Sequence, residues 1–290
     1  MPLIPTYYYD CPNSLEALSQ CLSEKQDVLP TFLAGGTDLW VNIQGKKKKY
    51  PWVIDLKGIP GLADIEVINP SLLKVGALVN MNTIEKSPII RQHALALAEA
   101  AQNVGSYQIR NRATIGGNIG NGAPTADTAI ALLALGVEVH TWSPQGARAI
   151  PIDAFWLQAG KTCLAHDEFI THIQLPIGAG MTSAFIKQGP RRAMDIAIVN
   201  TSVNISIKDH KIAEARIALG GAGSTPLRAK QAEEYLKGKT PEIDHFQEAS
   251  QMAVAESNPR SSSRASKEYR LDLIAVLVER ALQKTMEEGV

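Results

Sequence analysis

Two glycine-rich segments hold the residues of this sequence that are best suited to bind a ligand. The first is Ala34-Gly35-Gly36-Thr37-Asp38, directly after the short apolar run Thr31-Phe32-Leu33. The second is Thr114-Ile115-Gly116-Gly117-Asn118, inside a stretch rich in glycine and asparagine. Glycine permits positive φ and close approach of a ligand, and successive backbone N–H groups in such turns form an anion-binding concavity. Two such loops could hold a diphosphate from both sides without a lysine.

The standard nucleotide-binding motifs do not fit the rest of the chain. No GxGxxG follows a predicted strand, which argues against a Rossmann site. Gly160-Lys161-Thr162 imitates the end of a P-loop, but Phe155 stands where the first glycine is needed. Gly238-Lys239-Thr240 fails in the same way because of Glu233. We expect both to be turns. Either glycine loop alone could also be a structural turn, and the presence of both favours binding.

Composition excludes several classes of protein. Lys+Arg and Asp+Glu both number 29, so a zero net charge gives no general attraction to nucleic acid or anionic membranes. No apolar run approaches the roughly 20 residues of a membrane helix. Residues 1–5 do not resemble the start of a signal peptide, and we expect a cytoplasmic protein. The three cysteines and six histidines lack metal-ligand spacing, which predicts no protein-bound metal. The run Lys46–Lys49 is either a solvated loop or a contact for phosphate or an acidic partner.

Apolar periodicity predicts the elements that must position the loops. Asn13 and Glu16 suggest a capping box at the start of a first helix, and the polar stretch 105–124 suggests an irregular segment. Pro176 to Gly180 is the best linker. We expect strands over 31–33, 52–55, 72–75, 137–141 and 169–173, a hairpin of 202–207 with 212–219, and helices over 91–103, 125–135, 242–256 and 266–286.

The two loops, in their context, resemble the flavin motifs of a known family. Residues 33–39 (LAGGTDL) resemble the first motif of the medium, FAD-binding subunits of molybdenum hydroxylases. Residues 108–118 (QIRNRATIGGN) resemble the second motif, and residues 121–127 its continuation. Residues 259–270 (PRSSSRASKEYR) are similar to the matching segment of bacterial xanthine dehydrogenase flavin subunits, and together with residues 192–195 they point to that branch. The resemblance covers essentially the whole chain.

The resemblance implies an α+β fold with two domains. Residues 1–178 would form a vanillyl-alcohol-oxidase-type (PCMH-type) FAD-binding domain, itself made of two α+β lobes. Residues 179–290 would form a small C-terminal α+β domain of the CO dehydrogenase flavoprotein type. The linker and the hairpin predicted from the pattern agree with this division.

The resemblance also implies a function. A molybdenum-cofactor large subunit would oxidise the substrate, an iron–sulfur small subunit would relay the electrons, and FAD in this chain would pass them to NAD+ or another acceptor. Molybdenum and iron–sulfur clusters would be confined to the partner subunits. The flavin subunit of a carbon monoxide, nicotinate or aldehyde dehydrogenase is the alternative in the same class. A scaffold that has lost FAD is the alternative in a different class.

Family positions name the residues that would contact FAD. Asp127 would lie near the ribityl hydroxyls, or would be an ordinary carboxylate at a helix start. Ile170 would face the flavin and Lys187 its polar edge, although Lys187 could equally be a surface lysine. Val104 would be an apolar contact, or part of the core. The full set is Thr31, Phe32, Leu33, Ala34, Gly35, Gly36, Thr37, Asp38, Val104, Thr114, Ile115, Gly116, Gly117, Asn118, Asp127, Ile170 and Lys187.

Overall fold

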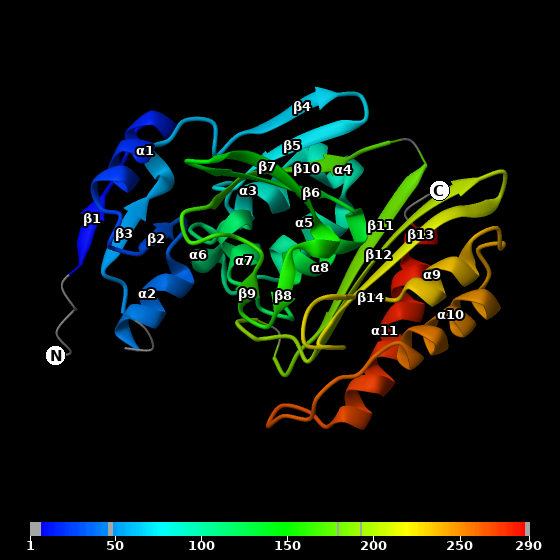
Figure 1. Cartoon of the computed structure of the whole chain (residues 1–290). Coiled ribbons are helices and arrows are strands. Elements are labelled where there is room, and N and C mark those ends of the chain that lie inside the picture. Colours follow the sequence, from blue (N-terminus) through cyan, green and yellow to red (C-terminus); the bar gives the residue numbers. More distant parts are fainter. Residues whose placement is uncertain (1–6, 46–48, 179, 192, 288–290) are drawn as a thin grey trace.

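The structure, a computed structural model, describes residues 7–45, 49–178, 180–191 and 193–287. Lys46 to Lys48 of the lysine run and residues 1–5 therefore lie outside the described residues. Figure 1 shows three parts side by side: a small N-terminal sheet with two helices, a five-stranded sheet over a group of helices, and a four-stranded sheet covered by the C-terminal helices. Within the described ranges, no helix is long and apolar enough to cross a membrane.

A parallel three-stranded sheet, in the order β1-β3-β2, forms the N-terminal lobe and leads into the first glycine loop. Every residue of β3 is buried, because Leu18 and Leu22 of the first helix pack with Trp52 and Ile54 of this strand. The elements of this lobe are β1 (Tyr8–Asp10), α1 (Leu15–Glu24), β2 (Pro30–Leu33), α2 (Thr37–Gln44), β3 (Trp52–Asp55) and η1 (Leu56–Gly58).

An antiparallel sheet in the order β4-β5-β10-β6-β7 forms the second lobe. Val75, Ile173, Val139 and Ile150 lie in register across four of its strands, and all four are buried in the main core. A short hairpin, β8 with β9, lies in the chain between β7 and β10 of this sheet. The bounds are β4 (Ile65–Asn69), β5 (Leu72–Gly76), β6 (Glu138–Ser143), β7 (Gly146–Pro151), η2 (Ile152–Ala154), β8 (Trp156–Gln158), β9 (Lys161–Thr162) and β10 (Phe169–Pro176).

Six helices form the centre of the molecule. The last of them, α8, is buried along its whole length because it packs against other helices on one side and against the C-terminal sheet on the other. The bounds are α3 (Met81–Lys86), α4 (Pro88–His93), α5 (Leu95–Gln102), α6 (Tyr107–Arg110), α7 (Ile115–Gly120) and α8 (Asp127–Leu135).

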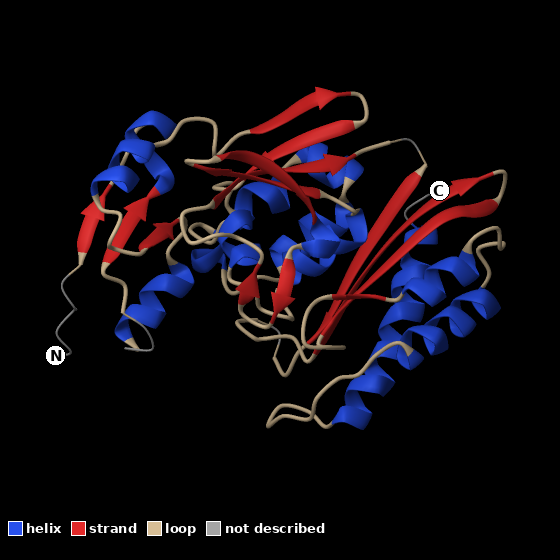
Figure 2. Cartoon of the chain, in the orientation of Figure 1, coloured by secondary structure: helices blue, strands red, loops and turns tan. Residues whose placement is uncertain are grey.

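The C-terminal part is an antiparallel sheet in the order β11-β12-β13-β14. Three helices pack on one face of this sheet, as Figure 2 shows, while α5 and α8 contact it from the other lobe. The predicted hairpin is confirmed, and Asp209 and His210 form its turn with φ of 52° and 58°. The bounds are β11 (Met181–Gln188), β12 (Val199–Lys208), β13 (Lys211–Gly220), β14 (Leu227–Arg228), α9 (Lys230–Leu236), α10 (Ile243–Ala255) and α11 (Lys267–Glu287).

Three local predictions are wrong. Ser14, not Asn13, caps the first helix: its Oγ accepts from the N–H of Ala17 at 3.1 Å, so Glu16 stands one position too early for a capping box. The helix predicted over 91–103 is two helices, α4 and α5, separated at Ala94, whose φ of −150° is not helical. The stretch predicted to be irregular contains α6 and α7, each started by a Ser or Thr cap.

Candidate functional site

The two glycine loops lie against each other although they are far apart in sequence. A Cβ added to Gly35 would lie 1.9 Å from the carbonyl oxygen of Arg112, so the backbones of the two segments are in direct contact. The Cβ of Ala34 lies 3.8 Å from the position that a Cβ on Gly117 would occupy. The fold therefore brings the two predicted segments together at one place, at the junction of the first two lobes.

The first loop presents its backbone N–H groups without acceptors. Gly36 has a φ of 79° and precedes the first residue of α2, Thr37. The first helical bond runs from the N–H of Trp40 to the carbonyl of Gly36. Within the described part of the chain, the N–H groups of residues 35–39 donate to no protein acceptor. Successive free N–H groups at a helix start suit an anion such as a diphosphate.

The second loop donates its N–H groups from Ile115 to Asn118 to acceptors within the protein. Ile115 and Gly116 donate to carbonyls of the segment after β5, at 3.1 and 2.9 Å. Gly117 donates to the Oγ1 of Thr114 at 3.2 Å, and Asn118 to the carbonyl of the same threonine at 2.9 Å. The prediction that both loops offer free N–H groups is therefore wrong for the second loop. Its turn serves to hold the fold together beside the first loop.

The apolar residues of the predicted set line the surroundings of the loops. Ile170 on β10 is only 6% exposed, and its Cδ1 lies 3.7 Å from the position of a Cβ on Gly120. Val104 is half-buried and packs on the same core as Ile170. Phe32 is half-buried too, with its ring centroid 5.3 Å from that of Phe169. For Ile170 and Val104, core packing is thus a role that the structure shows directly.

Asp127 and Lys187 form a buried ion pair between the helix α8 and the strand β11. The Nζ of Lys187 lies 2.7 Å from Oδ2 of Asp127 and 3.3 Å from Oδ1 of Asp195. All three side chains are at most 8% exposed, so the interpretation of Lys187 as a surface lysine is wrong. Burial raises the pKa of Asp127 to about 6, although the charge of Lys187 and a hydrogen bond from Asn200 act in the opposite direction.

The donors of Lys187 are fully used by the protein. Besides the two carboxylates, its Nζ donates to the carbonyls of Asn103 at 3.1 Å and Asp195 at 3.2 Å. An ammonium group has three N–H donors, and four oxygens already surround this one. A contact of Lys187 with a ligand would require one of these bonds to break.

Asn200 belongs to this network, although our sequence analysis did not identify it. Its Nδ2 donates to Oδ1 of Asp127 at 2.7 Å and to the carbonyl of Thr125 at 3.2 Å. The side chain is fully buried in β12. The run of three consecutive polar residues Asn200-Thr201-Ser202, which interrupts the alternation of the strand, was the available signal, since buried polar groups need partners.

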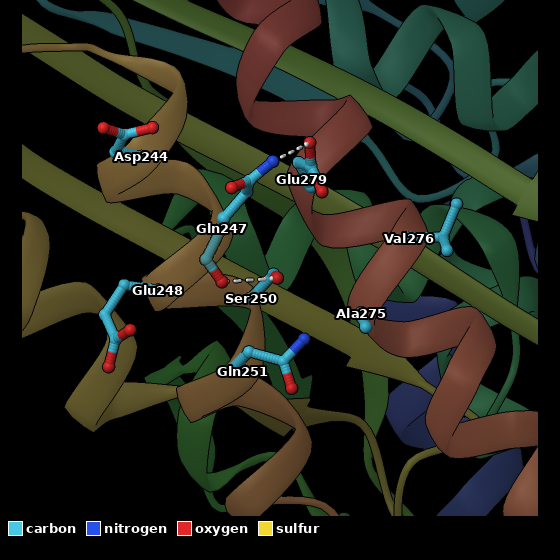
Figure 3. Close-up of a pocket in the computed structure, with 8 residues that line it drawn as sticks. All are labelled: Asp244, Gln247, Glu248, Ser250, Gln251, Ala275, Val276 and Glu279. Carbon is cyan, nitrogen blue, oxygen red and sulfur yellow. Dashed lines mark hydrogen bonds between the residues drawn. The ribbon is translucent and has the colours of Figure 1, made fainter.

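The structure has one cavity beside the Asp127 network and another that is remote from it. A cavity of about 450 Å³ opens beside the network and is lined by Asn103, residues 187–191 and Asp195. A second, of about 470 Å³, lies in the C-terminal part between α10 and α11. Figure 3 shows that Asp244, Glu248 and Glu279 surround this second hollow, and that Gln247 donates to Glu279 across it. None of the predicted site residues lines the second hollow.

Comparisons with known proteins agree with this geometry. Residues 5–178 match the family model of the FAD binding domain in molybdopterin dehydrogenase, and residues 184–285 that of the CO dehydrogenase flavoprotein C-terminal domain. A putative xanthine dehydrogenase FAD-binding subunit of Escherichia coli (strain K12) is 33% identical over 88% of each chain. The nicotine 6-hydroxylase medium subunit of Paenarthrobacter nicotinovorans is 30% identical over 96% of this chain and 97% of its own. A solved carbon monoxide dehydrogenase from Hydrogenophaga pseudoflava superposes with a TM-score of 0.92 at 30% identity, covering 98% of this chain and 99% of that chain. The expected fold class is confirmed.

Proposed function

This chain belongs to the FAD-binding family of molybdopterin dehydrogenases, and we propose that it binds one FAD non-covalently and passes electrons from an iron–sulfur partner to NAD+ or another acceptor. The observation that carries the proposal is the direct contact of the two glycine loops beside a row of free backbone N–H groups at residues 35–39. FAD would supply the exchange of one and two electrons, and the protein would bind and orient it.

The first loop is the proposed diphosphate site. The N–H groups of residues 35–39 would donate to the phosphate oxygens, and the start of α2 would add its positive dipole end. Residues 31–34 would bring the chain to this turn. Residues 114–118 would form the opposite wall, with the hydroxyl of Thr114 and the amide of Asn118 as its polar groups. Val104 and Ile170 would be the apolar contacts of the flavin ring.

Asp127 is the proposed acceptor for the ribityl hydroxyls. It receives one hydrogen bond on each carboxylate oxygen, which leaves further lone pairs for a ligand. Lys187 and Asn200 would act through Asp127 and not on the ligand, because their own bonds fix that carboxylate from the C-terminal part of the chain. We propose the division into a FAD-binding domain, residues 1–178, and a C-terminal domain, residues 179–290, on the same basis.

We propose xanthine dehydrogenase as the parent enzyme, in the cytoplasm, with an iron–sulfur small subunit and a molybdenum-cofactor large subunit as partners. The support is the segment 259–270 and the 33% identity to a putative xanthine dehydrogenase subunit. The 30% identity to a nicotine 6-hydroxylase subunit and to the carbon monoxide dehydrogenase medium chain keeps another hydroxylase as the alternative. Isolated chain should not oxidise xanthine, and turnover by the chain alone would contradict this division of labour.

Docking to those partners would use exposed aromatic and apolar groups. Tyr107 is a candidate for this role, because it is 52% exposed and is flanked by the cations of Lys86 and Arg110. Trp156 is only 9% exposed, and its indole N–H donates to the carbonyl of Ile119, so it belongs to the core. Co-expression with both partners should give a complex that survives high salt on a sizing column.

The test of the FAD proposal is the chromophore. The purified chain should be yellow, and acid precipitation should release all of the flavin into solution, because no His or Cys lies in either loop. A yellow pellet would show a covalent flavin. A colourless protein that takes up no FAD on reconstitution would support the scaffold alternative.

A further inference from the structure

Arg270, in the first turn of α11, is a buried cation without an acidic partner. Its side chain is 6% exposed. One Nη donates to the carbonyl of Ile198 and the other to the Oγ of Ser262 at 3.0 Å, while the buried Nε has no acceptor. In the described ranges, no carboxylate forms an ion pair with it. A buried guanidinium is normally paired, because removing an isolated charge from water is costly.

The residues around Arg270 add positive charge. After burial, the charges of Arg264 and Arg260 are the causes that lower the pKa of Arg270. Both of these arginines are exposed, on the loop that precedes α11 and projects from its end in Figure 1. This loop is folded back on itself, because the N–H of Ser262 donates to the carbonyl of Ala265 at 2.9 Å. Ser262, whose Oγ accepts from Arg270, lies two positions from each of the other two arginines. The three arginines therefore belong to one loop and helix start, and none of them forms an ion pair with a carboxylate among the residues that the structure describes.

The cluster lies close to the Asp127 network. The Nη1 of Arg270 lies 3.2 Å from the position of a Cβ on Gly221, and the Cγ2 of Thr125 lies 3.4 Å from the same point. The carbonyl of Thr125 accepts from Asn200, which in turn donates to Asp127. Thr125 therefore lies between Arg270 and the hydrogen bonds of Asn200 and Asp127, and a ligand held by the arginines would be close to that network.

We propose that Arg260, Arg264 and Arg270 form a binding site for a phosphate-type oxyanion. The planar guanidinium group bonds phosphate oxygens in pairs, and three such groups match the two or more negative charges of a phosphate or diphosphate. Arg270 supplies a fixed charge from beneath, and the exposed Arg260 and Arg264 can close over the anion. The phosphate would come either from free inorganic phosphate or from a nucleotide.

Calorimetric titration of the full chain at low ionic strength tests the site. Inorganic phosphate and ADP are the two probes. We expect the arginine site to bind one phosphate, and Arg264→Gln to weaken binding at this site about tenfold. The matched control is Arg280→Gln, which changes an exposed arginine of α11 ten positions after Arg270 and should leave phosphate binding unchanged. ADP binding more than tenfold tighter than phosphate would identify a nucleotide as the source, and equal affinities would identify the free ion.

Two further variants separate this site from the first glycine loop, which could also hold phosphate. Gly36→Val should leave the arginine site intact, so that loss of phosphate binding in Gly36→Val alone would assign the anion to the loop and overturn the proposal. The conservative Arg270→Lys keeps the charge but not the paired donors, and should weaken binding in a chain whose circular dichroism is unchanged. Equal binding by the wild type and by the double variant Arg260→Gln/Arg264→Gln would also refute the site.

Discussion

The first glycine loop (residues 34–38) and the second (residues 114–118) have similar compositions but opposite uses of the backbone. The first leaves the N–H groups of residues 35–39 without protein acceptors, whereas the second donates its N–H groups to its own cap and to a neighbouring segment. Both loops run into a helix, α2 from Thr37 and α7 from Ile115, so the difference lies in how each helix start is bonded. Thr114 caps α7 with its side chain, and residues 115 and 116 donate to residues 79 and 77, whereas Gly36 gives α2 no side-chain cap.

This comparison assigns different chemistry to the two halves of the proposed site. Backbone N–H groups carry no titratable charge, so their own contribution to binding an anion does not change between neutral and mildly acidic pH. The N–H groups of residues 115–118 are all donated within the protein, so the second half, from residue 114 to Asp127, would meet a ligand through side chains such as those of Thr114, Asn118 and Asp127. One of these side chains, Asp127, changes its charge near pH 6. Glycine in the first loop thus serves the ligand, and in the second it serves the packing.

Gly35→Ala should have the largest effect, because it breaks the contact that joins the two loops. The new Cβ would lie 1.9 Å from a backbone oxygen, which cannot move aside as a flexible side chain can. We expect a loss of about 3 kcal/mol in the free energy of unfolding, together with the loss of FAD. Urea denaturation followed by fluorescence measures the first effect, and absorbance of the purified chain the second. A stable, yellow variant would show that the loops do not need this contact.

Gly36→Val should remove FAD while the fold survives. Its φ of 79° is disfavoured for a β-branched residue, at a cost of about 1–2 kcal/mol, and the turn that aims the free N–H groups would change. Loss of two hydrogen bonds to a charged phosphate corresponds to an affinity about a hundredfold lower. Reconstitution with FAD, monitored by quenching of flavin fluorescence, measures it. Full occupancy in this variant would mean that the first loop is a structural turn only.

Gly117→Val should have a smaller effect on FAD than Gly36→Val, because no free N–H group is lost. The added Cβ would lie 3.0 Å from the Oγ1 of Thr114 and 3.8 Å from the Cβ of Ala34. Displacing the Thr114 cap costs about 1 kcal/mol of stability. We expect FAD to bind about tenfold more weakly by the same measurement. An effect as large as that of Gly36→Val would remove the distinction between the loops.

The sequence allowed the first loop to be located but not its helix. The strand 52–55, the strand predicted over 202–207 and found over 199–208, and the helices α10 and α11 follow from apolar spacing, which is a local property. The helix α2 was missed because a glycine precedes it and its eight residues show no clear apolar stripe. The short helices α6 and α7 were missed although Ser106 and Thr114 are ordinary caps, since glycine and asparagine dominate the composition around them.

The residues of the candidate site likewise fall into those that local sequence reveals and those that only the tertiary structure reveals. The glycine turns are local, so their residue types revealed them. The network of Lys187, Asp195 and Asn200 around Asp127 is tertiary: its bonds to Asp127 join residues 60 and 73 positions apart. No spacing rule connects such residues. For the same reason the sequence could not show whether Lys187 is buried or exposed. Its burial depends on the packing of β11 against α8.

Acidification should change the contribution of Asp127 to the free energy of unfolding by about 1 kcal/mol, whereas the N–H groups of the first loop do not titrate. The pKa of Asp127 is raised from 3.8 to about 6, so between pH 7 and pH 5 the folded chain takes up a proton that the unfolded chain does not. The contribution of this group to stability therefore increases by about 1 kcal/mol as the pH falls, and it is lost as the pH rises through 6. Affinity for FAD should fall over the same range, since the ionised carboxylate is the stronger acceptor.

The comparison with Asp127→Asn isolates this effect. His172, stacked on His140, has a pKa lowered to about 4 by burial, so its contribution to stability is lost as the pH falls below its ordinary value of 6.5. That opposite contribution is common to both proteins and cancels in the difference. Urea denaturation at pH 7 and pH 5 measures the difference directly. If it does not change with pH, Asp127 does not titrate in this range.

Lys161→Ala should have the smallest effect, and it tests whether the contrast between the loops extends to a third glycine turn. Gly160, with a φ of 74°, forms the turn of the β8–β9 hairpin, and its N–H donates to the carbonyl of Gly122 at 2.8 Å. Like the second loop, this turn uses its backbone for packing, and the exposed Lys161 side chain makes no hydrogen bond in the described structure. Flavin content and the urea midpoint should both equal those of the unaltered chain. A loss of flavin in Lys161→Ala would mean that the hairpin, and not only the first loop, supplies a phosphate contact.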